Sequence, residues 1–99
     1  MTINKEKTGD KTSFILSGRL DTTTAPSLQE LLIPEFDSSK QIELDFANII
    51  YVSSAGLRVL LMGQKTAKSK DAQFILTNVS PEIMEVFEMT GFSDMLTII

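Results

Sequence analysis

Residues Glu43–Leu61, ELDFANIIYVSSAGLRVLL, join an alternating pattern, two serines and a long apolar run in direct succession. In the first part, Glu43 and Asp45 alternate with apolar side chains, which is the period of a half-buried strand. The run after the serines fits a helix from Ser54 to Lys70 that is apolar on several sides in its first two turns and polar in its later turns. A strand followed at once by a helix favours an α/β fold.

The residues upstream of this stretch predict a hairpin and a first helix. Residues 2–8 and 12–17 have the composition of two short strands around Gly9-Asp10, a common pair in tight turns. Thr24 is then a suitable N-cap for a helix that ends near Phe36. The apolar residues of this helix at helical spacing are Leu28, Leu31 and Leu32.

The residues downstream repeat the alternation of strand and helix. Residues 72–79 predict a buried strand, and Ser80-Pro81 is typical of an N-cap followed by proline at the first helical position. The next helix has Ile83, Val86 and Phe87 as its inner stripe and ends at Gly91, and residues 95–99 predict a final strand. We therefore expect one α/β domain over residues 1–99. It contains an N-terminal hairpin followed by alternating α and β elements, a mixed sheet of four to five strands, and three to four helices.

Composition excludes several classes of function. The 99 residues carry a net charge of −4, so no overall field attracts a nucleic acid. Histidine and cysteine are both absent, which removes the usual general base and the best nucleophile, and with them thiolate metal sites and disulfides. We expect a cytoplasmic protein that is not an enzyme, needs no cofactor or metal, and does not insert into membranes.

The two serines, Ser53 and Ser54, admit two interpretations. Serine is favoured at a helix N-cap, where its oxygen accepts a backbone N–H that lacks an intrahelical partner. Either hydroxyl could instead be a modification site. Arg58 is an independent hint, because a cation in the first turns opposes the helix dipole and yet lies at i,i+4 from Ser54. A solvated arginine is the plainer interpretation. We expect Lys65, Lys68 and Lys70 to be solvated, and Gly18 and Gly56 to serve backbone geometry or close packing.

Three segments together resemble the STAS domain, the family of bacterial anti-sigma-factor antagonists and of the cytoplasmic tails of sulfate transporters. They are SGRLDTTTAPSL (17–28), ELDFANIIYVSSAGLRVLL (43–61) and VFEMTGFSDMLTI (86–98), and they cover nearly the whole chain in the expected order. In such antagonists a serine before Gly-Leu is phosphorylated by a partner kinase. Aligned on Gly56-Leu57, that residue is Ser54, whereas Ser53 stands where the family has aspartate and Ala55 where it has a second hydroxyl.

The resemblance implies a phosphorylation-controlled antagonist. Unphosphorylated at Ser54, it would bind a kinase-type anti-sigma factor, a serine protein kinase, and release the sigma factor, and a PP2C-type phosphatase would reset it. The expected partner-binding residues are Asp21, Ser53, Gly56 and Arg58, although Asp21 also suits a simple Asx turn. The alternatives are a constitutive STAS interaction module, for example in a membrane transport complex, and a weak nucleotide-binding domain.

Overall fold

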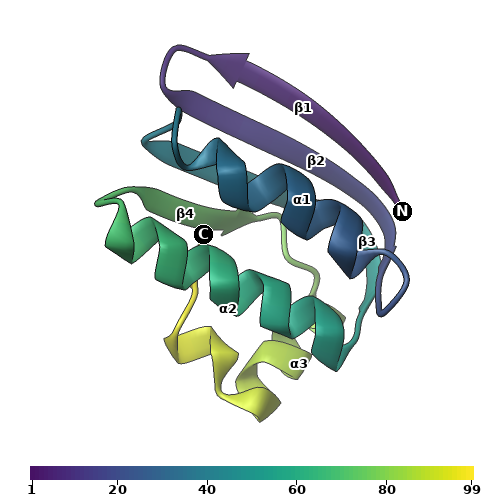
Figure 1. Cartoon of the computed structure of the whole chain (residues 1–99). Helices are drawn as coiled ribbons and strands as arrows, with labels where there is room; N and C mark the ends of the chain where they lie inside the picture. The colour runs from purple at the N-terminus through teal and green to yellow at the C-terminus, as the bar shows by residue number, and fades with distance from the viewer.

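Five strands form one mixed sheet in which the spatial order equals the sequence order. The computed structural model describes residues 1–99, with β1 (Thr2–Thr8), β2 (Lys11–Leu20), α1 (Ala25–Glu35), β3 (Gln41–Val52), α2 (Ser54–Ser69), β4 (Gln73–Thr77), α3 (Pro81–Thr90), the single 3-10 turn η1 (Phe92–Asp94) and β5 (Thr97–Ile98) (Figure 1). β1 and β2 are antiparallel, and each later pair is parallel. The predicted α/β class, mixed sheet and N-terminal hairpin are confirmed.

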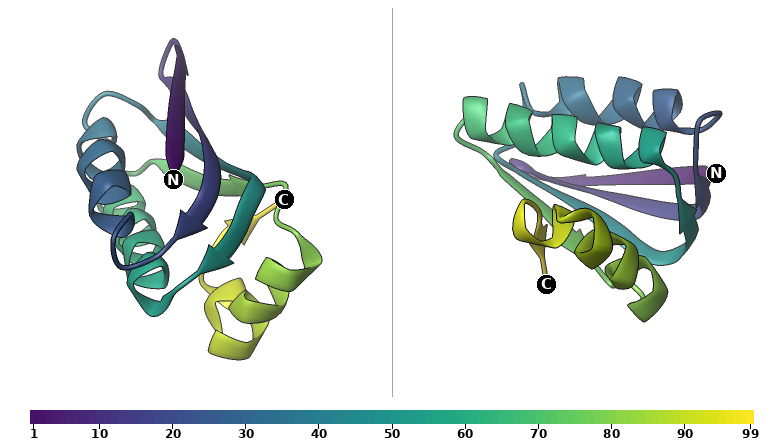
Figure 2. Two further views of the ribbon diagram at one scale, coloured as in Figure 1. Left: turned by 90° about the vertical axis from the view of Figure 1, so that its right-hand side faces the viewer. Right: turned by 90° about the horizontal axis from the view of Figure 1, so that it is seen from below.

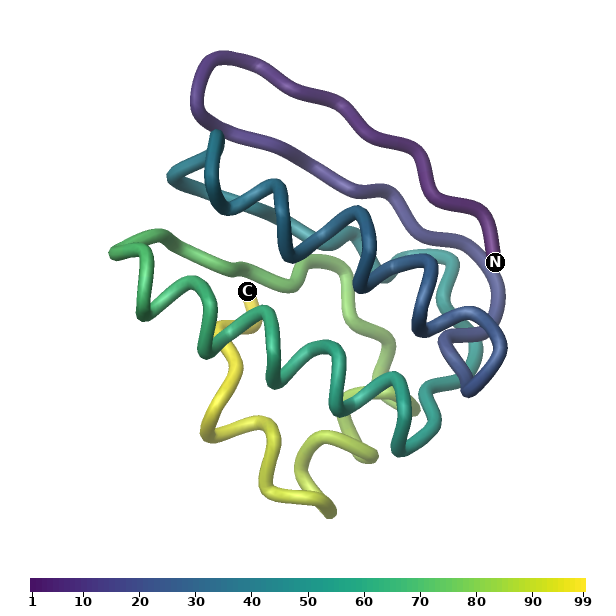
Figure 3. The backbone as a smooth tube through the Cα atoms, in the orientation of Figure 1, coloured from purple at the N-terminus to yellow at the C-terminus, as the bar shows by residue number.

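The helices form two layers around this sheet. Figure 2 shows α1 and α2 side by side on one face, whereas α3 and η1 lie on the opposite side. The backbone tube in Figure 3 brings the N-terminus beside the end of β2. There a Cβ on Gly18, whose φ is +105°, would lie 3.4 Å from the Cα of Met1. No helix of the structure is both long enough and apolar enough to span a bilayer.

The main core lies between the sheet and the α1–α2 layer. Side chains from three neighbouring strands form a continuous buried row, because Phe14 pairs with Leu44 and Leu44 with Leu76. Leu28 and Leu32 of α1 are fully buried. Helix α3 is held by Phe87, which belongs to the same cluster of buried residues and whose ring centroid is 6.2 Å from that of Phe46. Leu60 of α2 is fully buried in the same core, which holds α2, and with it the hydroxyl turn at its start, against the sheet.

Several sequence predictions need correction. Leu31 is 46% exposed although it has helical spacing with Leu28. Val86 is only half-buried, so Ile83 and Phe87 form the inner stripe of α3. The predicted last strand begins too early, because Met95 follows η1 and only Thr97–Ile98 pair with β4.

β2 and β3 run further than their hydrophobic alternation predicts. The register between them shifts twice, once between Ile15 and Ser17 and once between Gly18 and Arg19. Each shift leaves an extra residue in β3, so the alternation of buried and exposed positions breaks and consecutive residues such as Ile50 and Tyr51 both face solvent. The bulges let both strands continue to Leu20 and Val52, beside the start of α2.

A buried carboxylate ties the hairpin to α1 at the other end of the sheet. Glu35 is 7% exposed, and its oxygens accept hydrogen bonds from Thr12 Oγ1 at 2.9 Å and Ser39 Oγ at 2.8 Å. The ammonium groups of Lys5 and Lys7 lie 2.6 and 3.1 Å from the same carboxylate. Burial alone would raise the pKa of Glu35, but these four donors outweigh it and hold the pKa far below its ordinary value.

Candidate functional site

The start of α2 lies against the adjacent carboxyl ends of β2 and β3. Leu20 and Val52 are paired as the last residues of these parallel strands. One residue further, a backbone hydrogen bond links the two segments, because the N–H of Ser53 donates to the carbonyl of Leu20 at 2.9 Å. Asp21, the residue after Leu20, is therefore brought close to the serine pair, although the two lie over thirty positions apart in sequence.

The two serines have different roles at the helix start. Ser53 is the N-cap, with extended backbone and a side-chain oxygen that accepts the N–H of Gly56 at 3.3 Å. Its carbonyl accepts the N–H of Leu57 at 2.9 Å. Ser54 is the first helical residue, is exposed, and its hydroxyl makes no hydrogen bond within the chain. The cap is thus supplied by Ser53, and the Ser54 hydroxyl is free for another group.

Gly56 allows α2 to approach the β2 loop. A Cβ at this buried position would lie 2.8 Å from both the Cγ and the carbonyl oxygen of Leu20, and 3.1 Å from Cγ1 of Val52. The carbonyl is backbone and cannot move aside without displacing the end of β2. The absence of a side chain at Gly56 therefore lets the first turn of α2 pack directly on Leu20, the residue before Asp21, which supports the packing role predicted for this glycine.

We expect Gly56→Ala to destabilise the protein. Alanine is the better helix former by about 1 kcal/mol, so helix propensity alone predicts a gain. Overpacking typically costs about 1–3 kcal/mol, and here the clash includes backbone. Urea unfolding should therefore show a net loss of stability. Ala55→Ser is the matched control on the same turn, because Ala55 is only half-buried and already has a Cβ. A G56A variant as stable as the wild type would contradict this close contact.

Asp21 organises the loop between β2 and α1. Its Oδ1 accepts the N–H and the hydroxyl of Thr23 at 3.0 and 2.8 Å, and the N–H of Thr24 at 3.2 Å. Thr24 is the predicted N-cap of α1, yet its hydroxyl bonds backwards: it donates to the Arg19 carbonyl at 2.7 Å and accepts from the Asp21 N–H at 2.9 Å. Asp21 therefore forms the Asx turn that was one of its two predicted roles.

These donors also hold Asp21 in its ionised form. The Thr23 hydroxyl contributes most to lowering the pKa of this carboxyl, and partial desolvation, which would raise it, is outweighed with further help from the N–H groups of Thr23 and Thr24. Arg19 Nε lies 3.6 Å from Asp21 Oδ2. The loop thus presents a fixed, ionised carboxylate that is paired with a cation.

Sequence reasoning missed a stacked pair beside this loop. Arg19 and Tyr51 are register partners in the parallel ladder, and the Arg19 guanidinium carbon lies 4.2 Å from the centroid of the Tyr51 ring. Such stacking is a cation–π contact. Ile50, the bulged residue next to Tyr51, is 72% exposed. Only the strand register, which composition and spacing do not reveal, brings Arg19 to Tyr51.

Arg58 lies on the exposed side of α2, one turn after Ser54. Its side chain is exposed and has no ion pair or hydrogen bond in the structure. Arg58 is therefore solvated in the unmodified protein, which is the plainer of the two interpretations of the sequence. Lys65 and Lys68 are likewise without carboxylate partners. Lys70 is exposed, as expected, and its ammonium also forms a surface ion pair with Asp37 at 2.8 Å, beyond the end of α1.

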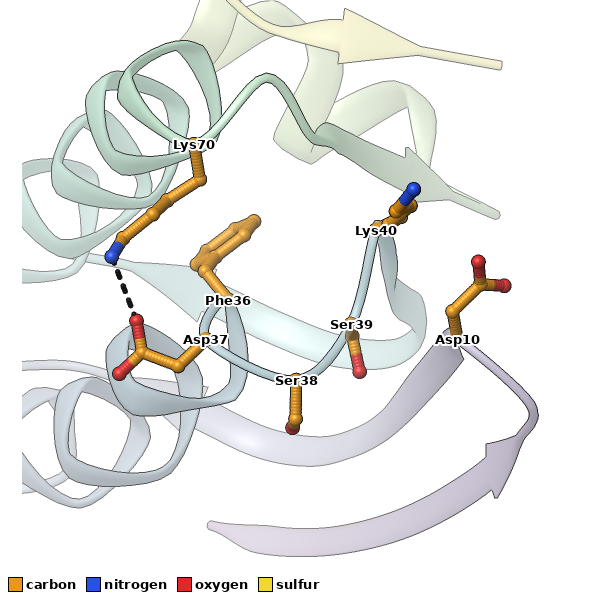
Figure 4. Close-up of a pocket in the computed structure, with 7 residues that line it drawn as sticks. All are labelled: Asp10, Phe36, Asp37, Ser38, Ser39, Lys40 and Lys70. Atoms are coloured by element: carbon orange, nitrogen blue, oxygen red, sulfur yellow. Dashed lines mark ion pairs between the residues drawn. The ribbon is translucent and has the colours of Figure 1, made fainter.

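The largest hollow of the surface is far from the serine turn. It measures about 350 Å³ and lies where the parallel strands begin, and Figure 4 shows the residues that line it, which are Asp10, Phe36, Asp37, Ser38, Ser39, Lys40 and Lys70. The Lys70–Asp37 pair crosses one side of it. Its two cations are balanced by two carboxylates, so the hollow offers no net charge to a phosphate or a nucleotide.

Comparison with known proteins assigns the family. The family model described as STAS domain matches residues 2–99. The chain belongs to the STAS domain family. An anti-sigma-B factor antagonist of Staphylococcus aureus is 32% identical over 82 residues, which are 82% of this STAS domain and 76% of the relative. The resemblance drawn from the three sequence segments is confirmed, and the relative places this STAS domain with the anti-sigma-factor antagonists.

Solved structures support the same fold for this STAS domain. The anti-sigma factor antagonist SpoIIAA in its unphosphorylated form is 19% identical and superposes with a TM-score of 0.85 over 99% of this chain and 88% of that one. SpoIIAA of Bacillus in its phosphorylated form gives a TM-score of 0.79 at 19% identity, over 99% and 91% of the two chains.

Proposed function

We propose that this STAS domain is a phosphorylation-controlled antagonist of an anti-sigma factor. In its unphosphorylated form it binds a kinase-type anti-sigma factor, so that the sigma factor is released. The kinase ends this state by phosphorylating Ser54, and a PP2C-type phosphatase restores it. The domain itself performs no catalysis and acts in the cytoplasm. The names of the S. aureus relative and of the two SpoIIAA structures support this proposal, since they describe antagonists and a phosphorylated form.

One observation of the structure carries the proposal: the capping role belongs to Ser53, so Ser54 is exposed with a free hydroxyl. Modification of Ser53 would alter the oxygen that accepts the Gly56 N–H. Modification of Ser54 leaves this cap as it is, because the Ser54 oxygen takes part in no bond that holds the fold. The departure from the family pattern at Ser53 is compatible with this arrangement, since serine caps a helix about as well as aspartate.

The expected reaction is phosphoryl transfer on the kinase. The Ser54 Oγ attacks the γ-phosphorus of ATP, the new O–P bond forms as the bond to the β,γ-bridging oxygen breaks, and ADP leaves. The hydroxyl proton passes to a base of the kinase, because no side chain of this domain accepts a hydrogen bond from Ser54. Positioning of the nucleophile by the rigid helix start is the domain's contribution.

The modification would act on binding, because the fold tolerates it. A phosphoryl group adds about −1.5 to −2 charges, and near a helix N-terminus an anion is favourable by about 0.3–1 kcal/mol. A complete switch of partner needs about 5.5 kcal/mol of differential binding. A charge of that size supplies such energy only where it is buried against the partner. Ser54 must therefore lie inside the contact surface, with Asp21, Ser53, Gly56 and Arg58 around it.

The proposal is tested by the affinity of the two forms for the kinase-type anti-sigma factor of the source organism. Titration calorimetry should show at least about 100-fold weaker binding after phosphorylation, which corresponds to about 2.7 kcal/mol. Equal affinity of both forms would contradict the switch and favour a constitutive STAS interaction module.

Asp21 is predicted to contribute to that binding through its charge. We expect Asp21→Asn, whose remaining side-chain oxygen can still accept from Thr23 and Thr24, to keep a melting temperature near that of the wild type. Asp21→Ala loses these bonds and should melt lower. Both should bind the anti-sigma factor about tenfold or more weakly if the partner reads the carboxylate. Wild-type affinity of D21N, with only D21A weakened, would limit Asp21 to loop structure.

A further inference from the structure

Among the charged residues around Ser54, Arg58 alone is left without an opposite charge. Asp21, the carboxylate of the neighbouring loop, is committed to Arg19 and to the donors of Thr23 and Thr24. Five of the nine cationic side chains pair with carboxylates, and Arg58 is not one of them. Helix α2 carries no acidic residue at all. The guanidinium therefore has nothing within the chain to neutralise it.

The geometry of α2 directs Arg58 at Ser54. Residues four apart in a helix are surface neighbours, with Cβ atoms roughly 6 Å apart. Every Cα–Cβ bond of a helix tilts toward the N-terminus, so a long side chain covers the turn that precedes it. For Arg58 that turn begins with Ser54, which is exposed on the same side. An arginine can reach an oxygen carried by Ser54 without a change in the backbone.

We infer that Arg58 is the intramolecular receptor of the phosphate on Ser54. The inference rests on the proposed function, in which Ser54 is modified. Arginine presents its N–H donors in a planar fork that matches two phosphate oxygens, and such charge-assisted pairs are about twice as strong as neutral hydrogen bonds. The acceptor group is supplied by the modification itself, and the donor lies one turn further along the same helix.

Because Arg58 pairs with the phosphate, phosphorylation changes the contact surface around Ser54 in two ways. Before modification, the neighbourhood of Ser54 has one net positive charge, because Arg19 and Asp21 compensate one another and Arg58 is free. After modification the phosphate brings about −1.5 to −2, so the net charge changes sign. At the same time Arg58 is withdrawn into the pair. A partner carboxylate that contacts Arg58 in the unphosphorylated complex would lose its cation and face the phosphate.

The test uses phosphoserine placed at position 54 during translation, so that no kinase is needed. Phosphorus NMR titration should give a second phosphate pKa that is lower in the Arg58 protein than in Arg58→Gln by about 0.3, the equivalent of one i,i+4 ion pair on a helix. Arg58→Lys should keep part of that difference, because a point charge remains. Lys65→Gln is the matched control, since it removes the same charge from the same helix but lies beyond reach of Ser54.

A phosphate pKa that is the same in R58Q as in the Arg58 protein would overturn the inference. So would an equal change in K65Q, because it would show only the general field of the helix. Phosphorylation should also raise the melting temperature more in the Arg58 protein than in R58Q, and equal changes in both would count against the pair. Failure of a kinase to modify Ser54 would refute the proposed function alone, since these titrations do not depend on it.

Discussion

Replacing Glu35 by alanine should lower the free energy of unfolding by about 2 to 4 kcal/mol, because it breaks a buried ion pair and hydrogen-bond cluster. The carboxylate accepts from Thr12 and Ser39, and both hydroxyls are buried. Without it they keep only their contact with one another at 2.6 Å. Lys5 and Lys7 are half-exposed and can turn to solvent, so the loss falls chiefly on the buried groups. Thermal unfolding should show a melting temperature lower by about 10 °C or more.

Glu30→Ala is the matched control for this prediction. Glu30 lies on the same helix, is exposed and forms no ion pair in the structure. Its removal should change stability by less than about 0.5 kcal/mol. Equal and small effects of E30A and E35A would show that the Glu35 cluster does not hold the hairpin to α1.

The same carboxylate predicts how stability depends on pH. The folded state lowers the pKa of Glu35, so the stabilisation is complete above the ordinary pKa of an unfolded glutamate and is lost as the pH falls toward the folded pKa. Asp21, whose pKa is also lowered, adds a contribution of the same sign. Urea unfolding of the wild type should therefore weaken below about pH 5, and Glu35→Gln should flatten that decline. A wild type equally stable at pH 7 and pH 3 would contradict the cluster.

The sequence predicted most of the fold because each element carried a local signal. The alternation of Glu43 and Asp45 with apolar residues located β3, and Ser80-Pro81 and Gly91 marked both ends of α3 correctly. The errors occur where contacts between distant segments determine which residues are buried and how far a strand extends. Leu31 has the right spacing but lies outside the face that α2 and the sheet cover. The bulges that extend β2 and β3 depend on pairing, which no single segment encodes.

The site was predictable only in its linear part. The motif around Gly56-Leu57 identified Ser53 and Ser54, and the structure shows which of them caps α2. The Arg19–Tyr51 stack required the parallel register of two strands, and the Glu35 cluster required the packing of the hairpin on α1. Neither the stack nor the cluster could be predicted from the composition or charge of the sequence, because both are formed by residues far apart in the chain.

The second large effect is expected at Ser54. Ser54→Ala should abolish phosphoryl incorporation by the kinase and leave stability nearly unchanged, because the Ser54 hydroxyl makes no bond in the fold. Ser53→Ala should remain modifiable but lose about 0.5–2 kcal/mol of stability, since it removes the cap from the Gly56 N–H. Ser54→Asp should mimic the modified form only in part, because it brings one negative charge where a phosphoryl group brings nearly two. The two alanine variants thus separate the modified serine from the structural one.

The central claim, that Ser54 and not Ser53 accepts the phosphoryl group, is tested most directly by peptide mass spectrometry after incubation with the kinase-type anti-sigma factor and ATP. We predict one phosphate on Ser54 in the wild type and in Ser53→Ala, and none in Ser54→Ala. Phosphate on Ser53 in the wild type, or on any residue outside the turn, would contradict the account. So would the absence of phosphate from all three proteins in the presence of a kinase that binds them tightly.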